Sequence, residues 1–273
     1  MKTVRTPEAL KEALKSHSGS IGFVPTMGAL HSGHRTLIEE ARAHNDIVVV
    51  SIFVNPTQFL EGEDLGSYPR REAADHKVCE LSGVDYLFYP EADVIYGDDE
   101  IALKAPDVRG FILEGASRPG HFDGMLTVVM KLLNMVAPTR AYFGKKDAQQ
   151  LLLIEQMVRN FFMDVEIVPV NTVREDDGLA LSSRNVYLSS EERTEALKLS
   201  HSLKRAGKMV MQGDYDVENI KTQMLEKLQP LKVEYVAIVD REFRRVDKIQ
   251  KDNTLILVAA RVGTTRLIDN LWI

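Results

Sequence analysis

Short apolar runs rich in β-branched residues recur through the first two thirds of the chain, and they restrict its fold more than any other feature. The clearest is "DIVVVSIFVN" at residues 46–55, which is apolar at nearly every position. Such runs are typical of strands covered on both faces, as in the parallel sheet of an α/β protein. The other runs of this kind are "SIGFVPT", "DYLFYP", "RAYFG" and "VEIVPV".

Helical patterns fill the intervals between these runs. Their apolar residues recur at the spacing of one helix face, in "RTLIEEARAHN", "REAADHKVCELSG", "MLTVVMKLLNMV" and "DAQQLLLIEQMVRNF". Alternating strands and helices predict a doubly wound, Rossmann-like parallel sheet. A sheet of this type binds its ligand outside the carboxyl ends of the strands.

The pattern changes after "REDDGLALSSRN" at residues 174–185. Two charged helical segments, Ser189–Gln212 and Tyr215–Leu228, precede the apolar runs "VEYVAIVD" and "TLILVAARVG", which we expect to pair as antiparallel strands. The sequence therefore predicts a Rossmann-like domain over residues 1–175 and a smaller α+β domain over residues 176–273.

Net charge and cysteine content narrow the class of protein. A formal charge of −6 gives no general attraction to a polyphosphate backbone, so nucleic acid is a poor candidate partner. Cys79 is the only cysteine, which excludes an intrachain disulfide and suits a reducing compartment. No apolar stretch approaches the ~20 residues that cross a bilayer. We expect a cytoplasmic protein with no membrane partner.

The segment "PTMGALHSGHRTL" at residues 25–37 sets His31 and His34 three positions apart, at a predicted strand-to-helix turn. Residues with this spacing face the same way, and the N–H groups of a first helical turn bind phosphate. Gly33 between them leaves room for a base or ribose. A structural helix cap is one alternative. A zinc site is another, but it needs a third ligand and usually a His pair at i, i+4.

Two further clusters carry hydroxyl and cationic groups. In "GLALSSRN", Ser182, Ser183 and Arg184 suit a triphosphate, since guanidinium geometry matches phosphate oxygens. In "YFGKKDAQQ", Lys146 would balance phosphate charge and Asp147 would accept a hydrogen bond from a ribose hydroxyl. The alternatives are a domain linker, a solvated lysine and a helix N-cap.

Two more clusters suit an organic acid. Asn55 and Gln58 in "IFVNPTQF" offer neutral amides to substrate hydroxyl groups, unless the segment is simply an Asn-Pro turn. Arg118 and His121 in "EGASRPGHFDGM" could bind a carboxylate or belong to an ordinary surface loop. Because parallel strands end at one edge of a sheet, we expect the five clusters to gather there.

Taken in order, "PTMGALHSGH", "FVNPTQF", "EGASRPGHFDG", "FGKKDAQQ" and "DGLALSSRN" closely resemble the pantothenate synthetase family, the pantoate–β-alanine ligases of the cytidylyltransferase-like nucleotidyltransferase superfamily. The resemblance implies ATP-dependent condensation of pantoate with β-alanine, through a pantoyl-adenylate, to give pantothenate, AMP and pyrophosphate. It places the chain in pantothenate and coenzyme A biosynthesis, with Mg²⁺ and as a homodimer.

The resemblance also implies roles for individual residues. His34 corresponds to the proton donor, and His31, Lys146, Arg184 and a phosphate-bound Mg²⁺ would offset the charge repulsion between carboxylate and ATP. Gln58 matches the glutamine shared by pantoate and β-alanine, and Gln150 matches a second pantoate contact. Lys145 and Ala148 stand where the family more often has acidic and aromatic residues. The implied ATP-binding residues are Met27, Gly28, Ala29, Leu30, His31, Ser32, Gly33, His34, Gly144, Lys145, Lys146, Asp147, Val173, Leu181, Ser182, Ser183 and Arg184.

Two other functions remain open on the sequence alone. A plain nucleotidyltransferase would act on a phosphorylated acceptor and would need cationic residues to bind its phosphate. The residues expected to bind the acceptor here are the amides Asn55, Gln58 and Gln150. A non-catalytic ATP-sensing module is the second alternative. We further expect "GEDLGSYPRRE" to form a mobile wall of the pocket, Cys79 to be a packing residue and Asp75 to be a candidate Mg²⁺ ligand.

Overall fold

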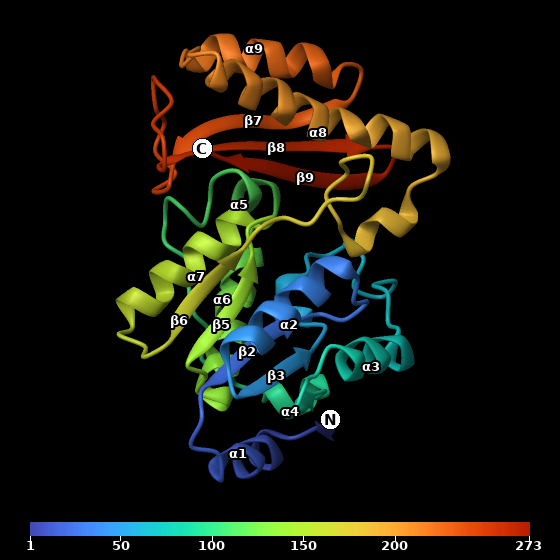
Figure 1. Ribbon diagram of the computed structural model, residues 1–273, viewed down its shortest axis with the longest axis vertical. Coiled ribbons are helices and arrows are strands. Elements are labelled where there is room, and N and C mark those ends of the chain that lie inside the picture. The colour runs from blue at the N-terminus through green and yellow to red at the C-terminus, as the bar shows by residue number, and fades with distance from the viewer. The chain divides into compact units, whose positions relative to one another are not determined.

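The computed structural model describes residues 1–273, which divide into two compact units (Figure 1). The first unit comprises Met1–Lys145 and Gln149–Asn171, and the second comprises Lys146–Ala148 and Thr172–Ile273. Each unit is built around its own sheet.

The sheet of the first unit has six parallel strands in the order β1-β4-β3-β2-β5-β6, which confirms the predicted doubly wound architecture. Val48, Val49 and Val50 of β3 are fully buried, as expected for a strand covered on both faces. The strands are β1 Lys2–Val4, β2 Ile21–Thr26, β3 Ile47–Ile52, β4 Tyr86–Phe88, β5 Arg140–Gly144 and β6 Glu166–Val170.

Helices connect these strands on both faces. Strand order reverses between β2 and β5, so right-handed crossovers put α2 and α3 on one face and α1, α6 and α7 on the other. The helices are α1 Pro7–Lys15, α2 Ser32–His44, α3 Glu72–Leu81, α4 Ala92–Ile95, α5 Glu114–Ser117, α6 His121–Val136 and α7 Ala148–Asn160, with a 3-10 turn η1 at Pro56–Gln58.

The two central strands part at their carboxyl ends. β2 pairs with β3 along its whole length, but with β5 only at Gly22 and Phe23. The Ile21 carbonyl accepts from the Thr139 N–H on the β5 side, and alternation along the strand turns the backbone of Pro25 to that same side. Proline has no N–H to donate, so the pairing stops there. The strands thus separate where the strand order reverses, which is the place a doubly wound sheet uses for ligands.

Cys79 lies on α3 and is fully buried in the core between α2 and the sheet. Burial raises the pKa of its thiol to about 12, so the thiolate does not form at neutral pH. Its predicted packing role is confirmed.

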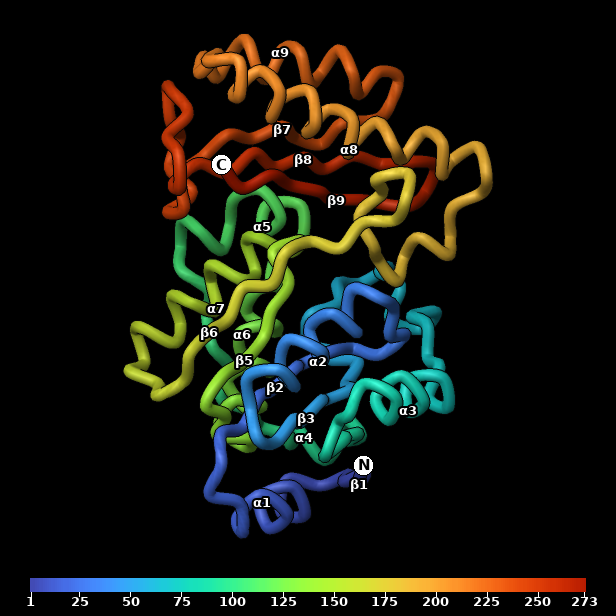
Figure 2. The backbone as a smooth tube through the Cα atoms, in the orientation of Figure 1, coloured from blue at the N-terminus to red at the C-terminus, as the bar shows by residue number.

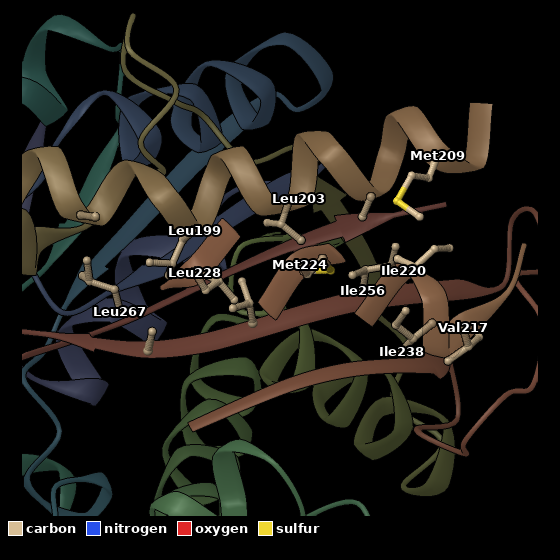
Figure 3. Close-up of a cluster of buried hydrophobic side chains, with 14 of the residues drawn as sticks. Leu199, Leu203, Met209, Val217, Ile220, Met224, Leu228, Ile238, Ile256 and Leu267 are labelled. Atoms are coloured by element: carbon tan, nitrogen blue, oxygen red, sulfur yellow. The ribbon is translucent and has the colours of Figure 1, made fainter. Parts of the chain in front are cut away.

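The second unit packs two helices on one face of an antiparallel sheet, in the order β7-β8-β9. Leu199, Leu203, Ile220 and Met224 of the helices meet Ile256 of β8 in the core (Figure 3). This confirms the predicted α+β region. Its elements are η2 Ser183–Tyr187, α8 Ser190–Met211, α9 Val217–Leu228, β7 Lys232–Asp240, β8 Thr254–Val262 and β9 Thr265–Trp272.

Two strands were not predicted, and both can be followed in the backbone trace (Figure 2). β1 has three residues and pairs only with β4. β9 buries Asp269 and Asn270, which interrupt the apolar alternation of a strand. No helix of the structure has the length and apolarity needed to cross a membrane.

Candidate active site

The two histidines of the HSGH motif cap α2 reciprocally. His31 is the N-cap, and its Nδ1 accepts from the Gly33 N–H at 3.2 Å, while Nδ1 of His34 accepts from the His31 N–H at 3.3 Å. The ring centroids lie 4.1 Å apart. A nitrogen that accepts a hydrogen bond carries no proton, so each neutral ring has its proton on Nε2. Both imidazoles are therefore arranged as Nε2–H donors.

The turn before the motif is held by a buried carboxylate. Gly28 and Ala29 have φ of 84° and 50°, in the left-handed region. The Asp75 carboxylate, on α3, accepts from the N–H of Ala29 at 2.9 Å and of Leu30 at 2.7 Å. Burial raises the pKa of Asp75, although both amide contacts act in the opposite direction. Each oxygen of the carboxylate thus has a backbone donor, so Asp75 shapes this turn. Its role as a Mg²⁺ ligand stays a prediction.

Asn55 and Gln58 lie at the carboxyl end of β3, as predicted, and both are buried. The Asn55 amide nitrogen donates to the Gln58 Oε1 at 3.1 Å and to the Gly124 carbonyl at 3.2 Å. Gln58 Nε2 lies 3.2 Å from the Met27 sulfur. The first unit thus brings the amide pair of Asn55 and Gln58 against Met27, the start of the HSGH turn, which comprises residues 27–31.

Arg118 and His121 lie beside the backbone carbonyl of Gln58. Arg118 binds both carboxylate oxygens of Glu63 at 2.6 Å, and His121 Nδ1 lies 2.8 Å from the Gln58 carbonyl. Burial, followed by the nearby Arg118 charge, lowers the pKa of His121 to about 4. His121 is therefore neutral at pH 7, and Glu63 ties the segment "GEDLGSYPRRE" to Arg118.

The carboxyl end of β5 is fixed by backbone and amide contacts. The Lys145 N–H donates to the Val170 carbonyl at 2.8 Å, and the Lys145 ammonium donates to Asn171 at 2.8 Å. On α7, buried Gln149 donates to the carbonyls of Arg109 and Ile112 at 2.6 and 2.9 Å. Gln150, the predicted pantoate contact, is the next residue and is half-buried.

The remaining predicted residues belong to the second unit. The Lys146 carbonyl accepts from the Asn270 amide at 2.7 Å, and the Lys146 ammonium lies 3.6 Å from Asp147. The backbone between β6 and α8, yellow in Figure 2, forms a short hairpin in which the Leu181 N–H donates to the Val173 carbonyl at 3.1 Å. Ser182 caps η2 by accepting from the Arg184 N–H at 3.3 Å.

Sequence reasoning did not single out Tyr96, Glu63 or Gln149. Each acts through a side-chain hydrogen bond to a residue between 35 and 55 positions away along the chain. No local pattern signals such contacts, because they depend on how the segments pack.

Comparison with known sequences gives one consistent result. The profile of the family described as Pantoate-beta-alanine ligase matches residues 2–272. The pantothenate synthetase of Sulfurimonas denitrificans is 60% identical over 273 residues, and the alignment covers 100% of both chains. That of Helicobacter pylori is 47% identical over 276 residues, again with 100% of both chains covered.

Solved structures agree with the sequence comparison. The pantothenate synthetase of Thermus thermophilus superimposes with a TM-score of 0.95 at 44% identity, covering 99% of each chain. A pantoate-beta-alanine ligase from Francisella tularensis, described as complexed with Beta-gamma ATP and Beta-alanine, gives a TM-score of 0.82 at 38% identity. That alignment covers 100% of this chain and 97% of the other.

Proposed function

The chain belongs to the pantoate–β-alanine ligase family, and from that membership we propose how its own residues carry out the reaction. It is an ATP-dependent ligase that condenses pantoate with β-alanine. The observation that carries this conclusion is the family match over residues 2–272. A plain nucleotidyltransferase or an ATP sensor would not account for a match of that length.

We propose that the reaction has two steps. A pantoate carboxylate oxygen first attacks the α-phosphorus of ATP, and the bond from that phosphorus to pyrophosphate breaks. The amine of β-alanine then attacks the acyl carbon of the pantoyl-adenylate, loses a proton, and displaces AMP. Neither step needs a covalent enzyme nucleophile. The protein's contribution is therefore to position the substrates and stabilise developing charge.

The reciprocal cap suggests how the HSGH histidines act. Each imidazole would donate from Nε2 to a phosphate oxygen. A neutral His34 whose Nδ1 accepts from the His31 N–H cannot release its Nε2 proton without becoming an imidazolate. We therefore propose that His34 stabilises the phosphates as a hydrogen-bond donor, without transferring its proton to pyrophosphate.

Cationic side chains of the second unit would neutralise the negative charge of the ATP phosphates. We propose that Lys146 and Arg184 bind phosphate oxygens, with Ser182 and Ser183 adding hydroxyl donors. The backbone supports this role: the Lys146 carbonyl is fixed by Asn270, and Arg184 follows the capped start of η2. Asp147 would accept from a ribose hydroxyl. Gly144, Lys145, Val173 and Leu181 would complete the ATP-binding segments.

We propose that amide side chains bind the hydroxy acid, pantoate. Gln58 and Gln150 would contact pantoate, and Asn55 supports Gln58 directly. We propose that Arg118 and His121 serve this pocket by holding its wall, because Arg118 already binds the Glu63 carboxylate with two hydrogen bonds. A second paired interaction of the Arg118 Nε and Nη2 groups with a substrate carboxylate would require Glu63 to leave.

We propose that Mg²⁺ enters with ATP. No group of three or more His, Cys, Asp or Glu side chains is arranged to hold a metal ion. Mg²⁺ commonly retains several waters and binds substrate phosphates with few protein ligands. When bound there it would offset phosphate charge.

We further propose that the chain acts as a cytoplasmic homodimer in pantothenate and coenzyme A biosynthesis, with the first unit making the contact between subunits. Family membership supports this proposal. Light scattering of the purified chain tests the assembly, and a mass corresponding to one chain would contradict it.

An assay of AMP release tests the reaction scheme. The protein is supplied with ATP, Mg²⁺ and pantoate, with and without β-alanine, and products are identified by mass. AMP and pantothenate should appear only when both pantoate and β-alanine are present. Release of a stable nucleotide conjugate without AMP would contradict the scheme.

A further inference from the structure

The orientation of the Gln58 amide follows from hydrogen bonds around Asn55. The Gly124 carbonyl can only accept, and it lies 3.2 Å from the Asn55 amide. The atom of Asn55 that faces it must therefore be the nitrogen. The same nitrogen donates to Gln58 at 3.1 Å, so the atom of Gln58 that faces Asn55 must be the oxygen.

This orientation turns the amide nitrogen of Gln58 away from Asn55. Nε2 lies 3.2 Å from the sulfur of Met27, at the start of the HSGH turn. A thioether is a weak acceptor, so an oxygen of a bound substrate is a better partner for this N–H group. Gln58 is thereby set as a donor, which suits the carboxylate and hydroxyl oxygens of a hydroxy acid.

Tyr96 completes this arrangement from the end of α4. Its hydroxyl donates to Asn55 Oδ1 at 2.7 Å, and the Thr57 hydroxyl donates to the same oxygen at 3.0 Å. Burial raises the pKa of the Tyr96 phenol, which keeps it a donor at neutral pH. The Lys131 ammonium lies 4.7 Å from the ring centroid, and it is held by the Ile95 carbonyl and Glu100, each at 2.7 Å. The ring is therefore fixed independently of its hydroxyl.

We propose that Tyr96 is a positioning residue for pantoate: through Asn55 it holds Gln58 with the amide nitrogen toward the substrate. Loss of the hydroxyl leaves Asn55 Oδ1 with the Thr57 donor alone, which weakens the hold on the Asn55 amide and, through it, on the Gln58 amide. The proposal rests on the proposed function, in which Gln58 contacts pantoate.

The test is a double-mutant cycle on the full chain with Tyr96→Phe and Gln58→Ala. Tyr96→Phe keeps the ring and its lysine contact, and should raise KM for pantoate about fivefold, the effect of losing one hydrogen bond. KM for ATP and the saturated rate should stay within about twofold. In the Gln58→Ala background, Tyr96→Phe should have no further effect, because its target is gone.

Tyr142→Phe is the matched control. The buried Tyr142 hydroxyl also bonds an asparagine, Asn45, at 2.8 Å, but it is no part of the amide pair. Its loss should lower Tm without changing KM for pantoate. An equal KM change in Tyr142→Phe, or additive effects of Tyr96→Phe and Gln58→Ala, would overturn the positioning role.

The cycle also separates the two levels of inference. If Gln58→Ala raises KM for pantoate and Tyr96→Phe does not, the role of Tyr96 is wrong and the placement of pantoate stands. If Gln58→Ala itself leaves that KM unchanged, the placement of pantoate is wrong, and the role of Tyr96 fails with it.

Discussion

At the residue scale, the two nitrogens of His34 have different tasks, and substitution can separate them. An asparagine oxygen can take the place of Nδ1 as cap acceptor, whereas a glutamine amide reaches the position of Nε2. His34→Asn should therefore keep α2 capped while removing the donor to phosphate. We expect a loss of about 100-fold or more in turnover, the usual effect of removing one donor from developing charge.

Thermal unfolding supplies the control for this substitution. His34→Asn should retain a Tm close to that of the unmodified protein, while His34→Gln should lose the cap and retain more activity. The reverse order, with His34→Gln less active than His34→Asn, would show that the donor at Nε2 is not what the reaction uses.

His121 gives a pH dependence of stability at the same scale. Its pKa is lowered by burial to about 4, against an ordinary value of 6.5. Between these values the unfolded chain binds a proton that the folded chain does not, so the free energy of unfolding should fall as the pH drops from 6.5 toward 4. The contribution is up to about 3 kcal/mol.

Urea unfolding at several pH values measures this contribution, with His121→Gln as the comparison. The difference in stability between the two proteins should shrink through the same acid range, because glutamine does not titrate. A difference that is independent of pH would mean that His121 is protonated alike in the folded and unfolded chains.

At the scale of elements, the site depends on how closely α6 approaches η1. A Cβ built on Gly124 would lie 2.2 Å from the Thr57 carbonyl oxygen and 2.8 Å from the Gln58 nitrogen. Gly124→Ala must therefore push the helix away from the amide pair. We expect a loss of about 1–3 kcal/mol of stability, together with a raised KM for pantoate.

Gly97→Ala is a suitable control for the glycine substitution. A Cβ at Gly97 would meet only Glu100 Oε1, at 3.6 Å, which is an ordinary contact. Denaturant unfolding and pantoate kinetics should both remain close to normal in this variant. Equal behaviour of the two alanine variants would contradict the close approach at Gly124.

The elements that sequence predicted are those whose burial pattern is local. β3 reads as a buried strand because its apolar run is nearly continuous, and Asn55 and Gln58 follow from where that run ends. β1 is too short to show a pattern, and it forms through backbone pairing with β4. The bond from Tyr96 to Asn55 joins residues 41 positions apart, so only the packed chain reveals it.

At the scale of the whole molecule, residues that lie together in sequence belong to different units. Lys146–Ala148 follow β5 directly, yet they group with Thr172–Ile273. Asn270 on β9 explains part of this grouping, since its amide donates to the Lys146 carbonyl at 2.7 Å across 124 positions of sequence. The last strand of the chain thus supports a cation that we propose to bind ATP.

Asn270→Ala tests that support. Removing the amide frees the backbone of Lys146, and the loss of this part-buried hydrogen bond should raise KM for ATP about fivefold while KM for β-alanine stays the same. Asn219→Ala is the control, because its side-chain bond to Asp214 is exposed on the surface of the same unit. Steady-state kinetics with each substrate varied in turn separates the outcomes. If both variants keep a normal KM for ATP, the position of Lys146 does not depend on β9, and the grouping has no consequence for nucleotide binding.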